Sequence, residues 1–188
     1  MDLSFLKKAL LDPGIYPDNP REIRWVETHI SLVFLTGKHA YKIKKPVDFG
    51  FLDFTSLEKR KFFCEQEVNL NRRLAPDIYL GVLKITERDG KVSFDGDGKV
   101  IEYAVKMEQL PEELLMNHLV QENRVTPPMM EAIAGKLVHH YQPAEIGAEY
   151  VGVGQVRNFL CPHFPDRPIV FRCVFRKLQI TFVTCKLI

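Results

Sequence analysis

The chain has 188 residues, of which 46% are hydrophobic and 27% are charged, and its formal net charge is +2. Because domains average roughly 100–200 residues, this length predicts one domain, or one domain and a fragment, with an ordinary buried core. No stretch approaches the roughly 20 consecutive apolar residues of a membrane span, so we expect no membrane-spanning helix. The net charge argues neither for nor against a nucleic-acid partner.

The amino-terminal quarter of the chain predicts one helix followed by strands. Leucines recur at helical spacing over residues 2–11, and the Asp-Pro-Gly that follows ends the helix. Residues 23–47 alternate in polarity and are rich in β-branched and aromatic side chains, which favours two or three strands. The Thr-Gly-Lys-His at 36–39 is typical of a hairpin turn.

A longer helix is predicted for residues 54–76. Thr55 or Ser56 is placed to cap its amino terminus, and Glu58 is placed to close a capping box. Its predicted inward face carries four residues at the spacing i, i+4, i+7 and i+11: Phe63, Glu67, Leu70 and Leu74.

Three further strands and two helices follow. The strands are predicted at 79–86, 91–94 and 99–107, with Gly-containing turns between them, and the helices at 110–120 and 127–141. Strands, one helix, more strands and then helices predict an α+β fold with a helix lodged in a largely antiparallel sheet.

The strand at 39–47 contains Lys42, Lys44 and Lys45, which raises the question of a phosphate site. A strand lysine that is fixed by a glutamate of the next helix is the device that holds ATP phosphates in kinases. Glu67, on an otherwise apolar stripe, is the favoured partner of Lys42, because a buried carboxylate needs a cation. Glu65 is the alternative partner, and a plain edge-strand lysine is the alternative role for Lys42.

Two stretches of the sequence resemble a known family. They are residues 28–82, from THISLVFLTGKHAYKIKKPV to NRRLAPDIYLGV, and residues 103–120, YAVKMEQLPEELLMNHLV. Both resemble bacterial aminoglycoside-phosphotransferase-like kinases, in particular the group often fused to a carboxy-terminal P-loop ATPase domain. The resemblance covers about residues 20–145. It implies a protein-kinase-like fold and ancestral ATP-dependent phosphorylation of a small molecule.

The resemblance also implies site residues. Lys42 matches the phosphate-binding lysine, and Glu67 or Glu65 matches its partner. The Lys-Met-Glu-Gln-Leu at 106–110 matches the hinge, where the carbonyl of Glu108 and the N–H of Leu110 would meet adenine.

The loop before Lys42 departs from the kinase pattern, since no GxGxxG precedes it. The hydroxyls of Thr28 and Ser31 are candidates to face phosphate, and an ordinary polar turn is the alternative. Asp48-Phe49-Gly50 is spelled like the kinase metal motif but precedes the helix that carries Glu67, so it predicts a structural turn with Phe49 and Phe51 packed.

The resemblance implies three segments. Residues 1–110 are a nucleotide-binding lobe, residues 111–150 a reduced helical lobe, and residues 151–188 an atypical tail. The tail has six basic residues against one acidic residue, together with three cysteines and five phenylalanines.

The machinery of phosphoryl transfer is incomplete in the sequence. No His-Gly-Asp catalytic loop is found, and Arg172 stands where the resemblance places the metal-binding Asp, so the sequence offers neither a catalytic residue nor a Mg²⁺ ligand. His163 and Asp166 are the one remaining candidate for a catalytic loop. A frameshift or an unrelated segment also explains the tail.

Three hypotheses follow for function. The first is a degenerate ATP-dependent phosphotransferase that binds nucleotide at most, with an unknown acceptor. The second is a working phosphotransferase with unrecognised catalytic acids. The third is a binding module that uses the basic aromatic tail for nucleic acid or a protein partner. The simpler alternative for the tail is a β-hairpin packed on the sheet, or an exposed apolar patch prone to self-association.

The cysteines bear on metal binding and compartment. Cys64 stands alone in the body of the chain, and no Cys/His spacing predicts zinc. The amino terminus lacks the pattern of a signal peptide, so we expect a reducing, cytoplasmic setting.

Overall fold

The computed structural model describes residues 3–141, which fall into two units, residues 3–115 and residues 116–141. The predictions for the tail, including those for Arg172, His163 and Asp166, lie outside the described residues.

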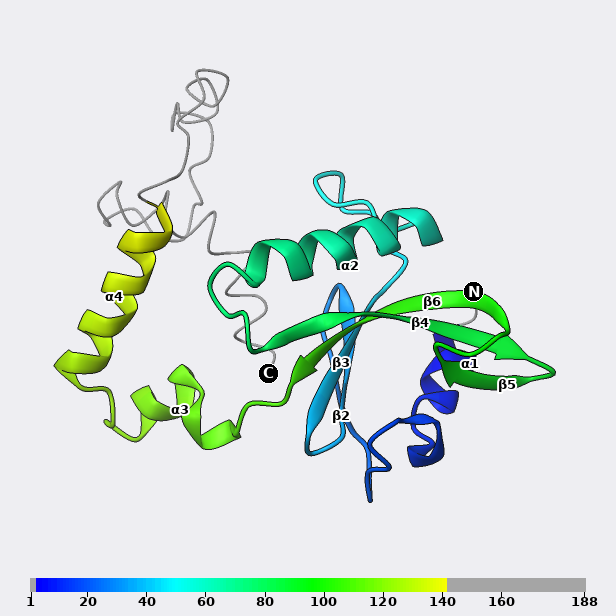
Figure 1. Ribbon diagram of the computed structural model, residues 1–188, viewed down its shortest axis with the longest axis horizontal. Coiled ribbons are helices and arrows are strands. Elements are labelled where there is room, and N and C mark those ends of the chain that lie inside the picture. Colours follow the sequence, from blue (N-terminus) through cyan, green and yellow to red (C-terminus); the bar gives the residue numbers. More distant parts are fainter. Residues whose placement is uncertain (1–2, 142–188) are drawn as a thin grey trace. The chain divides into compact units, whose positions relative to one another are not determined.

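The first unit is a mixed α+β structure built on one antiparallel sheet (Figure 1). Two or three strands were predicted for residues 23–47, and the structure has three; the three strands predicted after the long helix are confirmed. The elements in chain order are α1 (Leu3–Ala9), a 3-10 helix (Pro13–Ile15), β1 (Arg24–Glu27), β2 (Ser31–Leu35), β3 (His39–Lys44), α2 (Leu57–Asn71), β4 (Tyr79–Arg88), β5 (Lys91–Phe94) and β6 (Lys99–Glu108).

The sheet is curled and its strand order is β1-β2-β3-β6-β4-β5, with every neighbouring pair antiparallel. β3 therefore lies inside the sheet, where Lys42 is opposite Val33 of β2 and Val105 of β6. The alternative that Lys42 is an edge-strand charge is wrong.

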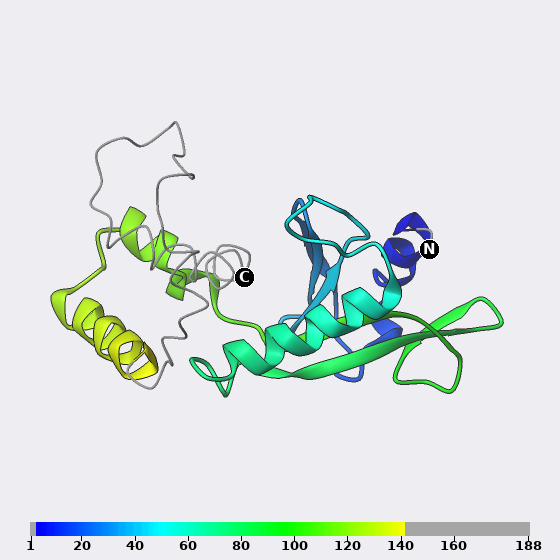
Figure 2. The same ribbon diagram turned by 90° about the horizontal axis from the view of Figure 1, so that it is seen from above.

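The two faces of the sheet are covered by different elements. In Figures 1 and 2, α2 runs along one face, and it packs there on β4 and β6 around Cys64, Val68 and Val105. On the other face, Leu6 and Leu10 from the amino-terminal segment join a cluster with Phe34 and other apolar strand residues. Both hydrophobic cores therefore close within residues 3–115.

The amino terminus of α2 is capped by Ser56, whose hydroxyl accepts a hydrogen bond from Lys59 N at 3.2 Å. Glu58 is then the second residue of the helix, one position too early for the predicted capping box. The Thr55 hydroxyl bonds instead to Asp53 at 2.6 Å. Of the two predicted caps, Ser56 is correct.

The buried stripe of α2 differs from the predicted one. Glu67 faces the sheet as expected, but Leu70 is 45% exposed, and the prediction for Leu70 is wrong. The buried stripe is largely polar, so a search for apolar periodicity misplaces its centre. Its members are Arg60, Cys64, Glu67, Val68 and Asn71.

The segment Asp48–Gly50 forms a turn, as predicted. The Asp48 carboxylate accepts a hydrogen bond from Gly50 N at 2.8 Å, and Gly50 has a φ of +76°, which glycine adopts without strain. Phe49 and Phe51 are nevertheless 47% and 89% exposed, and they stack on each other. The expectation that they pack into the protein is wrong, because the turn directs both rings outward.

The predicted helix at 110–120 is interrupted. A 3-10 turn at Glu112–Leu114 closes the first unit, and Leu115 is extended, with ψ of 137°. The second unit then contains the short α3 (Met116–Gln121) and α4 (Pro127–Tyr141). Within residues 3–141, no helix has the length and apolarity to cross a membrane.

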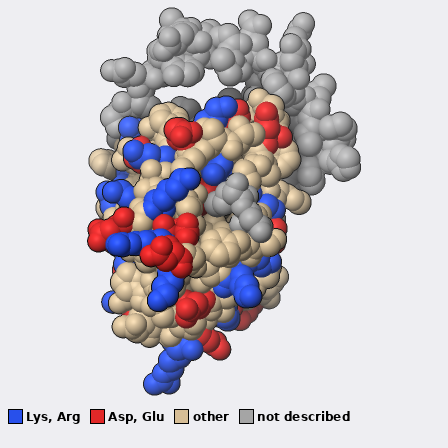
Figure 3. Space-filling view, turned by 90° about the vertical axis from the view of Figure 1, so that its right-hand side faces the viewer, with Lys and Arg blue, Asp and Glu red and all other residues tan. Residues whose placement is uncertain are grey.

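The surface mixes both signs of charge. On the face shown in Figure 3, basic and acidic side chains are interspersed over the coloured residues. That face therefore presents no extended field of a single sign of the kind that attracts a polyanion over a distance.

Candidate functional site

The predicted pair of Lys42 and Glu67 is in contact. Lys42 Nζ donates a hydrogen bond to Glu67 Oε1 at 3.0 Å. Lys42 points from β3 toward α2 because alternate strand residues share a face, and Glu67 lies on the sheet-facing stripe of α2. The structure thus selects Glu67 over Glu65, which lies on the outer side of α2 and pairs with Lys61 at 3.8 Å.

A second lysine shares the same carboxylate. Lys44, two residues along β3 and so on the same face as Lys42, donates to Glu67 Oε2 at 2.6 Å. The side chains of Lys42 and Lys44 are each 6% exposed, and that of Glu67 is 8% exposed. The sequence showed Lys44 as one of three strand lysines but gave no reason to place it beside Glu67.

Burial and charge act in opposite directions on the pKa values of Glu67 and Lys42. Burial raises the pKa of Glu67, but the two lysines outweigh it and leave that pKa below its usual range. Burial lowers the pKa of Lys42, and the attraction of Glu67 offsets only part of this. Glu67 is therefore firmly ionised, whereas the proton of Lys42 is held less tightly than on an exposed lysine.

Another buried ion pair lies beside the trio. Arg60 Nε donates to Glu102 Oε2 at 2.8 Å, and Arg60 also donates to the carbonyls of Phe54 and Thr55. Burial raises the pKa of Glu102, and Arg60 counters this in part. The sequence analysis missed this pair; the available signal was a lone acid, Glu102, within the apolar run 100–105.

The buried charges between α2 and the sheet do not balance. With both lysines protonated, Lys42, Lys44 and Arg60 are three cations facing the two carboxylates Glu67 and Glu102. Cys64 lies among them, but burial raises the pKa of its thiol to about 12, so it adds no negative charge at neutral pH. In that protonation state, Lys42 and Lys44 share the single charge of Glu67, and the described residues of the cluster hold one more cation than carboxylates.

The predicted phosphate-facing hydroxyls behave differently from each other. The Thr28 hydroxyl is used inside its own turn, where it accepts hydrogen bonds from Ser31 N at 2.9 Å and Ile30 N at 3.3 Å. Ser31 is fully buried, and its hydroxyl has no hydrogen-bond partner among residues 3–141. Because Ser31 is directly opposite Lys44 in the β2–β3 ladder, this hydroxyl lies on the same face as the lysines.

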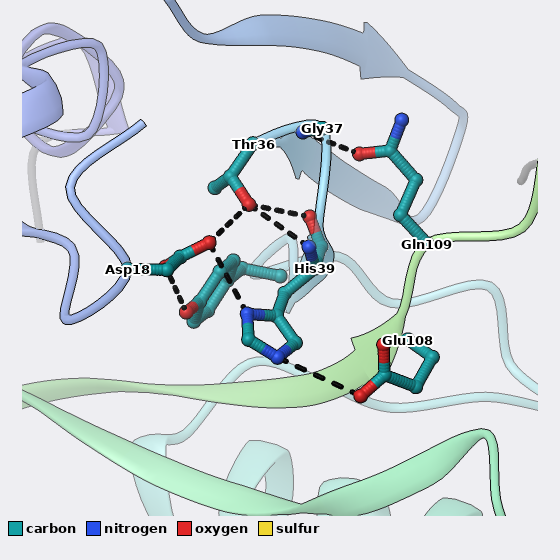
Figure 4. Close-up of polar contacts among 7 residues, drawn as sticks. Asp18, Thr36, Gly37, His39, Glu108 and Gln109 are labelled. Carbon is teal, nitrogen blue, oxygen red and sulfur yellow. Dashed lines mark hydrogen bonds and ion pairs between the residues drawn. The ribbon is translucent and has the colours of Figure 1, made fainter. Parts of the chain in front are cut away.

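The predicted hinge, residues 106–110, begins in the last three residues of β6, and the β2–β3 turn anchors it at Gln109 (Figure 4). Gln109 N donates to Lys38 O at 2.9 Å, and the Gln109 side chain accepts from Gly37 N at 2.9 Å. Glu108 N donates to Ile78 O at 2.9 Å. No group among residues 3–141 accepts a hydrogen bond from Leu110 N.

A polar cluster around Asp18 fixes the start of β3 (Figure 4). The Asp18 carboxylate accepts hydrogen bonds from the Thr36 hydroxyl at 2.6 Å, the Tyr41 hydroxyl at 3.0 Å and His39 Nδ1 at 3.1 Å. His39 Nε2 is 3.7 Å from the carboxylate of Glu108, where β6 ends. This cluster, which the sequence analysis missed, holds the strand three residues before Lys42.

The ion-pair cluster is closed. Two surface cavities of about 400 and 450 Å³ are lined by residues 21–24 with 35–37 and by residues 88–98 respectively, and neither is lined by Lys42, Glu67 or residues 107–110. Among residues 3–141, no group of three or more His, Cys, Asp or Glu side chains is placed to hold a metal ion. Because the side chains of Lys42 and Glu67 are 6% and 8% exposed, a ligand that binds Lys42 from solvent competes with Glu67 for its ammonium group.

Comparison with known proteins gives distant relatives without a stated activity. The chain is 33% identical over 119 residues to Uncharacterized protein Rv2004c of Mycobacterium tuberculosis and to Uncharacterized protein Mb2027c of Mycobacterium bovis. The matched stretch is 63% of this chain but only 22% of each relative. No protein-family model matches the chain. No solved structure matches it.

Proposed function

We propose that residues 3–115 bind the phosphates of a nucleoside triphosphate, with ATP as the expected ligand, through Lys42, which Glu67 positions before the ligand arrives. The observation that carries the proposal is the buried Lys42–Glu67 contact at 3.0 Å, within a cluster that contains one more cation than it has carboxylates.

The charge imbalance supports an anionic ligand. A buried charge without a partner is unfavourable, and a phosphate oxygen beside Lys42 supplies the missing negative charge. The topology supports the same proposal, because a strand lysine paired with a glutamate of the following helix is the arrangement that positions ATP phosphates in kinases. The N–H of Leu110 and the carbonyl of Glu108 are proposed to meet the adenine.

The proposal covers binding and stops short of phosphoryl transfer. It takes the first unit as a protein-kinase-like amino-terminal lobe of aminoglycoside-phosphotransferase-like descent, followed by a reduced helical lobe. No acceptor is proposed, and neither a catalytic residue nor a Mg²⁺ ligand is assigned. A cytoplasmic setting is part of the proposal, since ATP is the ligand.

Isothermal titration calorimetry with ATP tests the proposal on the full chain and on Lys42→Met. Methionine keeps the length of the side chain, and Lys44 still compensates Glu67, so the variant is expected to fold. We expect saturable heat from the wild type and an affinity at least about tenfold weaker in the variant, a loss of about 1.4 kcal/mol.

Lys61→Met is the matched control. It breaks the exposed Lys61–Glu65 pair on the outer side of the same helix and should leave ATP affinity unchanged. No saturable binding by the wild type, or equal binding by wild type and Lys42→Met, overturns the proposal.

A further inference from the structure

Lys44 is the feature of the buried cluster that the proposed function does not use. It donates to the second oxygen of Glu67 at 2.6 Å, and its ammonium group lies 5.0 Å from the centre of the Phe54 ring, within range of a cation–π contact. Among the described residues, the Lys42 ammonium group also has Glu67 as its one hydrogen-bond partner, but at the longer distance of 3.0 Å and without a cation–π contact. Of the two lysines, Lys44 is the more firmly held.

Ligand binding by Lys42 creates a problem that Lys44 is placed to solve. Because the Lys42 side chain is only 6% exposed, a phosphate group that binds it from solvent attracts its ammonium group away from Glu67. Glu67 is 8% exposed, so without another cation it would be left as a buried, uncompensated carboxylate. It would then take up a proton or turn away from the sheet, and the position that fixes Lys42 would be lost.

We propose that Lys44 is a positioning residue that keeps Glu67 charged and fixed in place while Lys42 engages the phosphates of its ligand. The inference rests on the proposed function and deepens it. One carboxylate serves two lysines with separate tasks: Lys42 exchanges between Glu67 and ligand, and Lys44 stays with Glu67 throughout.

The groups facing the trio from neighbouring elements support this division. From α2, Arg60 is already committed to Glu102 at 2.8 Å, so it is not a substitute counter-ion for Glu67. Cys64, also on α2, is a neutral thiol. The Ser31 hydroxyl on β2 is uncharged and sits beside Lys44. Lys44 is therefore the one cation among the described residues that remains for Glu67 when Lys42 leaves.

A ligand-free titration tests the role of Lys44 without reliance on ATP. The Lys42→Met variant imitates the state in which Lys42 has left Glu67. In this variant, NMR follows the ¹³C chemical shift of the Glu67 carboxyl group as a function of pH. We expect Glu67 to remain ionised at neutral pH in this variant, and its titration to move upward by more than one pH unit in Lys42→Met/Lys44→Met. Identical Glu67 titrations in the single and double variants overturn the inference.

A binding experiment gives a second test, which holds even if the double lysine variant fails to fold. Lys44→Met should weaken ATP affinity at least about tenfold, because Glu67 then retains Lys42 as its only cation. Lys44→Arg keeps a cation beside Glu67 and should bind ATP to within about threefold of the wild type. Wild-type affinity in Lys44→Met, or equal losses in Lys44→Met and Lys44→Arg, contradicts the inference.

The two proposals fail in distinguishable ways. If the wild type binds no ATP, the proposed function fails, while the Glu67 titration still decides whether Lys44 compensates Glu67. If ATP binding depends on Lys42 but Lys44→Met binds as the wild type does, the proposed function stands and the role of Lys44 is wrong. Lys61→Met remains the control in both arms.

Discussion

Several buried side chains in this protein are positioned by ion pairs and charge-assisted hydrogen bonds. Lys42, Lys44 and Glu67 form a buried trio, and Asp18 gathers three donors at the start of the same strand. Such groups contribute little when fully paired, but the removal of one partner leaves a buried charge and costs about 3–5 kcal/mol. The exact positions of these atoms are therefore determined more strictly than those of ordinary core residues.

The Asp18 cluster predicts a dependence of stability on pH. Burial raises the pKa of Asp18, but hydrogen bonds from Thr36, Tyr41 and His39 outweigh it, and the folded-state pKa lies below the unfolded value of 3.8. The unfolded chain therefore binds the proton more readily. The stabilisation from Asp18 is complete above pH 3.8 and is lost as the pH falls through the lowered folded-state pKa.

Asp18→Asn removes this contribution, since the amide has one acceptor oxygen where the carboxylate has two. We expect the variant to lose roughly 2–3 kcal/mol of unfolding free energy at pH 7. Urea denaturation at a series of pH values should show the difference from the wild type shrinking below pH 3.8. Asp77→Asn, at an exposed position, is the control. A difference that stays constant down to pH 2 contradicts the prediction.

At the residue scale, the sequence predicted a pair but not a network. The spacing and resemblance identified Lys42 and Glu67, because each is tied to a local pattern, a strand and an inward helix face. The roles of Lys44 and Arg60 depend on how closely α2 approaches the sheet, and no local pattern specifies that distance. In the Asp18 cluster, Asp18 contacts side chains that lie between 18 and 23 positions later in the sequence. No local sequence pattern connects Asp18 with those side chains.

At the scale of elements, α2 shows why an amphipathic pattern gave a partly wrong face. Its buried stripe contains Arg60, Glu67 and Asn71, which a hydrophobicity pattern assigns to solvent. The strands were easier to predict, because alternating β-branched residues and glycine turns act over a few positions. The helix predicted at 110–120 failed at Leu115, whose extended conformation has no signature in the sequence.

The corrected face of α2 gives a stability prediction. Val68→Ala opens space in the core beneath the helix, where Val68 is 4% exposed, and should cost about 1–3 kcal/mol. Leu70→Ala, on the outer side at 45% exposure, should change stability by less than about 0.5 kcal/mol. Urea unfolding measures both losses of unfolding free energy, provided that the variants keep the m-value of the wild type. Equal losses in the two variants would support the buried face that the sequence predicted, with Leu70 in it.

At the scale of the whole molecule, the described residues divide unequally. Residues 3–115 contain both hydrophobic cores, the ion-pair cluster and the predicted hinge. The second unit contributes α3 and α4, and α4 exposes apolar side chains, among them Met130 at 50% and Val138 at 58%. The chain spans 22% of the length of its mycobacterial relatives, so the activity of any longer protein stays a proposal.

This division predicts that a fragment of residues 1–115 folds by itself, because every residue of both core clusters lies between Leu6 and Met107. The fragment should unfold in a single cooperative transition. Its midpoint should lie within about 5 °C of the first transition of the full chain, which corresponds to a difference in unfolding free energy of no more than about 1 kcal/mol. Circular dichroism and amide dispersion in a ¹H–¹⁵N spectrum measure this. A fragment with Phe34→Ala should lose the transition, since that side chain is fully buried. If the unsubstituted fragment melts without cooperativity, stability comes from residues beyond 115, and the cores as described are insufficient to hold Lys42 and Glu67 together.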